Sequence, residues 1–125
     1  MANAADIMNV RKFLENNPNV VFAHLFGSAA SGKQRKNSDI DIGIFFKRSP
    51  RGLVLLKLIN RLSELAGADV DIVVLNKASA FLRHQVMKHR LKLTIKDRAA
   101  YVKFREKTIS DYDEYKYISG MNVYD

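Results

Sequence analysis

The chain has 125 residues, of which 47% are hydrophobic and 27% charged, and its net charge is +8. This composition excludes an intrinsically disordered chain and is typical of one globular domain, so we expect residues 1–125 to form a single domain with little length left for a separate substrate-binding domain. The absence of cysteine excludes disulfide bonds, thiolate metal sites and cysteine nucleophiles.

Hydrophobic periodicity predicts eight helices and strands. In chain order they are a helix at 4–16, strands at 20–26 and 39–46, a helix at 53–65, a strand at 69–75, a helix at 78–90, a strand at 91–95, and a long helix at 97–119 opened by an acidic cap. Residues 27–38 are small, polar and basic, and are expected to form a loop or the first turns of a short helix. This order predicts an α/β (α+β) fold in which helices pack against a mixed sheet of about four strands.

Three aspartates are expected to meet at one edge of this sheet. Asp39 and Asp41 alternate with isoleucines at the start of the second strand, so both point to the same face. Asp71 lies on the third strand, where Asp69 shares its face and is the alternative candidate. Converging carboxylates raise one another's pKa unless a cation neutralises them. Such ligands suit Mg²⁺, and two ions about 3.5–4 Å apart can clamp the attacking and leaving oxygens of a phosphoryl displacement.

A glycine and a serine at the end of the first strand predict a phosphate-binding turn. Gly27 lets the backbone approach a phosphate closely, and the Ser28 hydroxyl and the following amides can donate to its oxygens. Lys33, Arg35 and Lys36 would add positive charge near a triphosphate. A plain turn or helix cap is the alternative role for Ser28.

The spacing of these residues resembles a known family. Gly27-Ser28, ten residues and then Asp39-Ile40-Asp41 is similar to the Gly-Ser-x10-Asp-x-Asp signature of the nucleotidyltransferase superfamily. More closely, the chain resembles the minimal nucleotidyltransferase (MntA-like) antitoxins over nearly its whole length. The likeness includes Ser38 before the first aspartate, residues 70–76, and the helix-strand-helix tail from Phe81 onward.

This resemblance implies a polymerase-beta-like palm and a specific reaction. Antitoxins of this type are encoded beside a HEPN-domain ribonuclease toxin, which they silence by transferring AMP from ATP to a tyrosine near the toxin's active site. Carried over by position, Asp39 and Asp41 would bind Mg²⁺, and Asp71 would complete the metal site and help deprotonate the attacking hydroxyl. The nucleotide would lie against a set of small and basic residues, namely Gly27, Ser28, Lys33, Arg35 and Ser38.

Other functions stay open at this point. Many relatives have arginine where this chain has Ser31, so the main alternative is a catalytically weak protein that neutralises its partner by binding alone. Transfer to a small molecule such as an aminoglycoside would require an added helical domain. Residues 77–107 carry all of the net positive charge, which suits phosphates, nucleic acid or an acidic protein surface. Direct nucleic-acid binding is not the function that we expect.

The aromatic stripe of the last helix and the histidines are interpreted structurally. The stripe has three- and four-residue spacing and consists of Tyr101, Phe104, Thr108, Tyr112, Tyr115 and Ile118. It predicts packing against the sheet, with an interface to a partner or to a second copy as the alternative. We expect His24 to be a hydrogen-bonded core residue. His84 and His89 are five residues apart, which does not suit a metal pair on one helix.

The N-terminal residues and the lengths of the apolar runs predict the location of the protein. The first residues lack a basic segment followed by an apolar stretch, so a signal peptide is not expected. No apolar run approaches the roughly 18–20 residues that a membrane span requires. We therefore expect a cytoplasmic protein without a membrane partner.

Overall fold

The computed structural model describes residues 3–27, 39–88 and 90–122. It confirms the type and order of all eight predicted elements and adds one turn of 3-10 helix. The elements are α1 (Ala4–Asn16), β1 (Val20–Phe26), β2 (Ile40–Phe46), α2 (Gly52–Ala66), β3 (Val70–Val74), η1 (Leu75–Lys77), α3 (Ala80–Lys88), β4 (Arg90–Ile95) and α4 (Arg98–Asn122).

The boundaries differ from the prediction where local hydrogen bonds change the backbone path. The third strand ends at Val74 rather than at residue 75, because Leu75 enters the 3-10 turn. The acidic cap of the last helix is confirmed: the carboxylate of Asp97 accepts a hydrogen bond from the Ala100 amide at 3.0 Å. Such a bond satisfies one of the amides that a helix leaves unpaired at its start.

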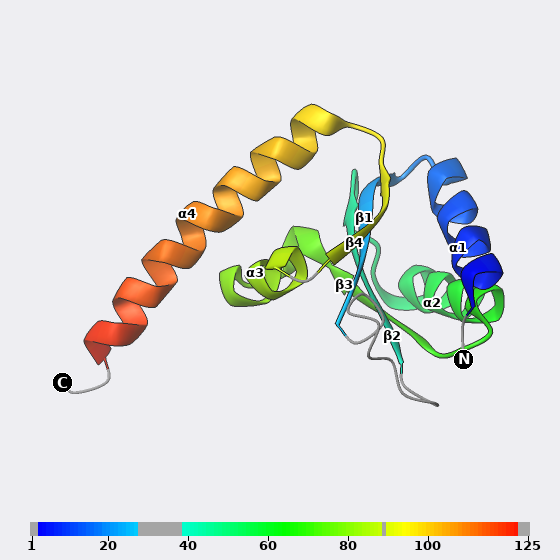
Figure 1. The fold of residues 1–125 in the computed structure, drawn as a ribbon, viewed down its shortest axis with the longest axis horizontal. Coiled ribbons are helices and arrows are strands. Elements are labelled where there is room, and N and C mark those ends of the chain that lie inside the picture. Colours follow the sequence, from blue (N-terminus) through cyan, green and yellow to red (C-terminus); the bar gives the residue numbers. More distant parts are fainter. Residues whose placement is uncertain (1–2, 28–38, 89, 123–125) are drawn as a thin grey trace.

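The four strands form one mixed sheet in the order β3-β2-β1-β4. β1 is antiparallel to both of its neighbours, whereas β2 and β3 run parallel. α2 makes the connection between these parallel strands, as such a pairing requires a crossover. α1 and α2 lie on one side of the sheet, and α3 and α4 lie on the other (Figure 1).

Each face of the sheet buries a separate core. On the α1/α2 face, alternate residues of β2 pack against Leu14 of α1 and Leu62 of α2; these β2 residues are Ile40, Ile42, Ile44 and Phe46. On the α3/α4 face, Phe22 of β1 packs against Tyr101 and Phe104, with ring centroids 5.2 Å apart in both pairs. The period of two along β2 therefore sends its remaining side chains, including Asp41, to the α3/α4 face.

Two contacts fix β2 against its neighbours, a hydrogen-bonded one at its end and a steric one at its middle. The amide side chain of Asn76 donates to the Phe46 carbonyl at 2.7 Å and accepts from the Phe46 amide at 2.9 Å, so it continues the pairing of β2 beyond the end of β3. Gly43 leaves room for α3, because a Cβ atom built there would lie 2.8 Å from Val86 Cγ1. α3 is thus seated directly over the middle of β2.

The aromatic stripe of α4 has two different environments. Tyr101, Phe104 and Thr108 are buried, which confirms packing for the first half of the helix. Farther along, Tyr115 is 42% exposed and Ile118 is 48% exposed, and the helix extends away from the sheet (Figure 1). In the described part of the chain, no helix combines the length and hydrophobicity that crossing a bilayer would need.

His24 is fully buried, as predicted, but the expectation that it is hydrogen-bonded is wrong. Within the described residues neither ring nitrogen has a hydrogen-bond partner, because the neighbouring groups are aromatic rings. The centroids of Phe22 and Tyr101 each lie 5.4 Å from the His24 ring. Burial lowers the pKa of His24 to about 4, and the nearby cations Arg90 and Lys92 act in the same direction. The imidazole is therefore neutral at pH 7.

This burial predicts a loss of stability in mild acid. The pKa of His24 is about 4 in the folded protein, against an ordinary value of 6.5, so the unfolded chain binds more protons. The free energy of unfolding should therefore fall as the pH drops below about 6.5, by about 1–2 kcal/mol between pH 7 and pH 5. Urea unfolding at both pH values measures this difference. His24→Leu should remove most of it, and an unchanged pH dependence in that variant would contradict the prediction.

Candidate active site

The parallel pairing of β2 and β3 places two aspartates side by side. In the register of these strands Asp41 lies beside Asp71, one position after the pair formed by Ile40 and Val70. Asp39 is exposed and directly precedes β2, two residues from Asp41. The three carboxylates therefore lie at the beginning of the two parallel strands, on the sheet face that α3 and α4 cover farther along.

Gly27 brings the end of β1 against this pair. Phe26, the last residue of β1, is the antiparallel partner of Asp41. Gly27 then turns the chain with φ of 72°, a left-handed conformation that favours glycine. A Cβ atom at this position would lie 2.8 Å from Asp41 Oδ2. Besides the role in phosphate binding that the sequence suggested, this glycine therefore makes room for the Asp41 carboxylate.

Burial and nearby negative charges make the ionised form of Asp41 unfavourable. The pKa of Asp41 is raised above its ordinary value, first by burial and then by the negative charges of Asp71 and Asp39. A bound cation would reverse this effect, because it stabilises the ionised form of each carboxylate. The donor set thus fits a hard divalent cation in its chemistry.

The arrangement is not a closed protein cage. Across residues 3–27, 39–88 and 90–122, no three His, Cys, Asp or Glu side chains are grouped so that they could hold a metal ion by themselves. Mg²⁺ commonly takes only one or two carboxylates from a protein and completes its shell with water and substrate phosphates. An open pair such as Asp41 and Asp71, with Asp39 nearby, suits that mode of binding.

The register also distinguishes the two candidate aspartates around the third strand. Asp71 contributes to the raised pKa of Asp41, whereas Asp69 is not among the charges that do so. The backbone carbonyl of Asp69 instead accepts a hydrogen bond from the Ile40 amide at 2.8 Å, just before the paired strands begin. The geometry therefore favours Asp71 as the third carboxylate of the site.

Several predicted nucleotide contacts lie outside the described residues. They belong to the segment between β1 and β2 and are Ser28, Lys33, Arg35, Lys36 and Ser38, together with Ser31. Of the predicted phosphate-binding set the structure places Gly27 alone, at the edge of the carboxylate pair.

Two further residues, one at the far end of β2 and one beside the site, have structural roles that sequence reasoning did not assign. Asn76 ties η1 to β2 through both of its amide atoms. Arg90 is the partner of Phe26 on the opposite side from Asp41, and its guanidinium donates to the Met87 carbonyl at 2.6 Å. The position of Asn76, a polar residue directly after a buried strand, could have indicated its role from the sequence. The position of Arg90, across Phe26 from Asp41, follows only from the strand order.

Comparison with protein families identifies this arrangement. The family model described as polymerase beta, nucleotidyltransferase matches residues 8–99, which includes the sheet and all three aspartates. The chain belongs to the polymerase beta nucleotidyltransferase family. The resemblance in the sequence and the predicted polymerase-beta-like fold are thereby confirmed.

Relatives within the nucleotidyltransferase family include a protein adenylyltransferase. The chain is 33% identical over 78 residues to protein adenylyltransferase MntA of Shewanella oneidensis, covering 62% of this chain and 56% of that protein. The chain therefore spans little more than half the length of this curated relative.

Solved structures extend the similarity to the whole fold. A toxin-antitoxin crystal structure with AMP-PNP matches with a TM-score of 0.80 and 30% identity, over 91% of this chain and 93% of that one. A structure of the tri-AMPylated S. oneidensis HEPN toxin in complex with MNT antitoxin matches with a TM-score of 0.74 and 26% identity, over 93% of each chain.

Burial of Asp41 and its repulsion by the neighbouring carboxylates predict a variant that is more stable than the parent protein. A raised pKa means that the ionised carboxylate is less favourable in the folded than in the unfolded state, so stability falls as the pH rises through the raised value. Without divalent cations, Asp41→Asn should raise the Tm at pH 7 by roughly 1–4 °C. Differential scanning calorimetry tests this, with Asp69→Asn as the control that should leave the Tm unchanged.

Gly27→Ala adds only one methyl group, but we expect it to disturb the carboxylate site. The added methyl group would meet Asp41 Oδ2 at 2.8 Å, and the left-handed backbone would be strained. We expect a loss of about 1–2 kcal/mol in the free energy of unfolding and weaker nucleotide binding. Denaturant unfolding and ATP-binding titrations measure the two effects. Gly120→Ala, at a helical position with open space around its Cβ, is the matched control.

Proposed function

We propose that this chain is an antitoxin-type nucleotidyltransferase that transfers AMP from ATP to a tyrosine hydroxyl of a cognate HEPN ribonuclease toxin, with Mg²⁺ as its metal cofactor. The observation that carries the proposal is the pairing of Asp41 with Asp71, beside Asp39 and Gly27, in a chain of the polymerase beta nucleotidyltransferase family. Retention of all three carboxylates favours catalysis over simple masking of the partner.

The relatives support both the reaction and the partner. One is a protein adenylyltransferase, and another belongs to a structure in which the HEPN toxin carries three AMP groups. A third belongs to a toxin-antitoxin structure that contains the ATP analogue AMP-PNP. The two matches to solved structures cover more than nine-tenths of this chain. The similarity therefore includes the sheet that carries the carboxylates and the helices that pack on it.

The carboxylates have distinct roles in this proposal. Asp39 and Asp41 would hold Mg²⁺, which when bound neutralises them and stabilises the negative charge on the phosphates of ATP. Asp71 would complete the site and accept the proton of the attacking tyrosine hydroxyl. Burial, and then the charges of Asp71 and Asp39, raise the pKa of Asp41, so a bound cation would offset the cost of ionising this carboxylate.

The reaction balances as a single displacement at the α-phosphorus of ATP. The tyrosine oxygen forms a new bond to that phosphorus, and the bond to the bridging oxygen breaks, so pyrophosphate leaves with the bonding electron pair. Gly27 would let the backbone approach the triphosphate closely, and Ser28, Ser38, Lys33 and Arg35 would supply donors and positive charge to it. Placing the reacting atoms in line is the main contribution that a protein makes to this kind of transfer.

Transfer of label from α-labelled ATP tests the proposal directly. The purified chain, the protein encoded by the adjacent gene and Mg²⁺ are combined, and label on the partner is measured after electrophoresis. Asp39→Ala/Asp41→Ala should lower the initial rate by about 100-fold or more, because it removes the groups that organise charge at the phosphates. Asp69→Ala, which changes a neighbouring carboxylate outside the proposed site, should retain most of the activity.

The outcomes separate catalysis from neutralisation by binding. Label on the partner that depends on Mg²⁺ and on the two aspartates supports the adenylyltransferase. A tight complex that inhibits the ribonuclease without ATP, and that acquires no label, would instead establish neutralisation by masking and would direct attention first to Ser31.

A further inference from the structure

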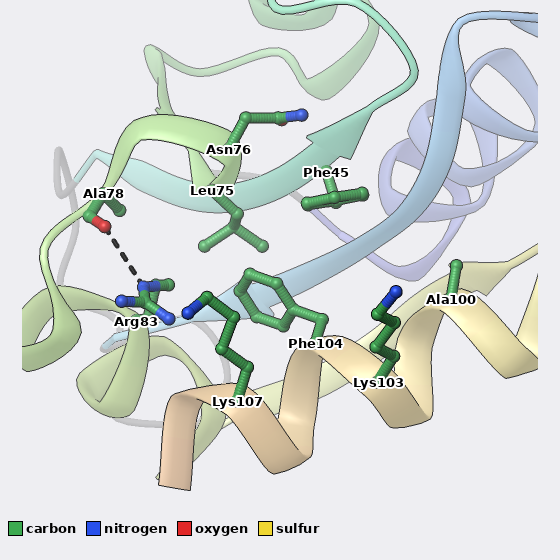
Figure 2. A pocket seen from close by; sticks show the side chains of 9 residues that line it. All are labelled: Phe45, Leu75, Asn76, Ala78, Arg83, Ala100, Lys103, Phe104 and Lys107. Carbon is green, nitrogen blue, oxygen red and sulfur yellow. Dashed lines mark hydrogen bonds between the residues drawn. The ribbon is translucent and has the colours of Figure 1, made fainter. Parts of the chain in front are cut away.

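A hollow lies on the α3/α4 face, away from the carboxylates. It has a volume of about 420 Å³ and lies between the end of β2, the 3-10 turn η1, α3 and α4 (Figure 2). Its floor is apolar and is formed by Phe45, Leu75, Ala100 and Phe104, with Ala78 at one side. We call this hollow the α4 pocket.

The α4 pocket is separate from the proposed nucleotide site. Phe45 lies four residues after Asp41 on the same strand and the same face, which corresponds to roughly 13 Å along the sheet. Between the two positions Val86 of α3 and Leu75 close over Gly43. A nucleotide held at the aspartates would therefore leave the α4 pocket free.

The polar groups that line the floor are already occupied. Both amide atoms of Asn76 are bonded to the backbone of Phe46. Arg83 donates to the Ala78 carbonyl at 3.1 Å and pairs with Asp111 at 3.0 Å, and the first of these bonds is visible in Figure 2. A small polar molecule, which is usually recognised by a few precisely placed buried polar groups, would find few partners here.

Two lysines give the mouth of the pocket a positive charge. Lys103 and Lys107 are exposed residues one helical turn apart on α4, and in Figure 2 both side chains extend from α4 toward the hollow. Lys103 makes no ion pair with the described residues. Lys107 contacts Asp111 at 3.3 Å, but Asp111 is also paired with Arg83. The pocket therefore combines an apolar floor with uncompensated positive charge.

A partly exposed set of aromatic side chains is shared by α3 and α4, the two helices that border the pocket. His84 stacks on Tyr112 at a centroid distance of 3.7 Å, and Phe81 contacts Tyr115 at 5.8 Å. Phe81 and Tyr115 are 45% and 42% exposed. Aromatic residues of this kind, next to a hollow with a charged border, are typical of a protein-protein interface.

We propose that the α4 pocket is a docking site for an apolar side chain carried on an acidic segment of the protein partner. Its identity as the HEPN toxin rests on the proposed function. The apolar floor would bury the anchoring side chain, and Lys103 and Lys107 would attract the Asp or Glu residues beside it. The docked partner would be held on the same sheet face as the carboxylates while the nucleotide site remains accessible.

Binding of the purified HEPN partner, measured without ATP by biolayer interferometry, tests this docking site. Lys103→Glu/Lys107→Gln reverses the charge at the mouth, and Ala100→Leu fills the floor. Each variant should raise the Kd at least 10-fold. Lys12→Glu/Lys57→Gln makes the same change in net charge on the exposed surfaces of α1 and α2, and should change the Kd less than 3-fold.

The outcomes separate the docking site from the proposed reaction. With the partner in excess, the pocket variants should recover nearly the full rate of AMP transfer, because the carboxylates are untouched. An unchanged Kd in both pocket variants would overturn the docking site while leaving the enzyme assignment intact. Tight binding without any AMP transfer by the parent chain would overturn only the enzyme assignment. No binding by the parent chain would overturn the docking site, and label transfer would then decide the enzyme assignment.

A cross-linking experiment tests the chemistry of the docked segment. Because the chain has no cysteine, Lys103→Cys provides a single thiol for labelling with a benzophenone maleimide. Mass spectrometry of the irradiated complex should identify a partner peptide in which an apolar residue lies beside Asp or Glu. Cross-links to a basic or wholly polar segment would overturn the proposed occupant.

Discussion

The parallel pairing of β2 and β3 is the constraint on which the site depends. It places the carboxylates of Asp41 and Asp71 next to each other at the start of both strands, where burial, and then the negative charges of Asp71 and Asp39, raise the pKa of Asp41. The fold tolerates this arrangement because Ile40 and Ile42, the residues on either side of Asp41 in β2, are buried in the opposite core. Hydrophobic burial on one face thus stabilises a charged arrangement on the other, as is common where structure serves function.

The two faces of the sheet therefore have different tasks. α1 and α2 cover one face with a continuous apolar core. On the other face, α3 sits over Gly43 and divides the surface into the carboxylate site at one end of β2 and the α4 pocket at the other. α4 crosses this face and then extends past it, with its later aromatic residues exposed (Figure 1). One short domain can in this way present a reaction site and a separate binding surface on the same side.

Much of this was predictable from residue patterns. The strand predicted at 39–46 alternates so regularly around Asp41 that its two faces could be assigned before its neighbours were known, and Asp97 was recognisable as a helix cap. The prediction for His24 was correct on burial and wrong on hydrogen bonding. An apolar strand indicates that a residue is buried, but the identity of its neighbours comes from other elements, and here Phe22 and Tyr101 present aromatic rings to it.

The sequence by itself determined the elements, their order and the residue types able to handle a metal-bound nucleotide, because these depend on periodicity and on short spacings along the chain. Only the tertiary structure decided that β2 lies between β1 and β3, that Asp71 rather than Asp69 stands beside Asp41, and that the α4 pocket exists. These features depend on strand register and on helix packing between residues far apart in sequence. Such contacts are set by the shape and burial of whole elements, which no local pattern contains.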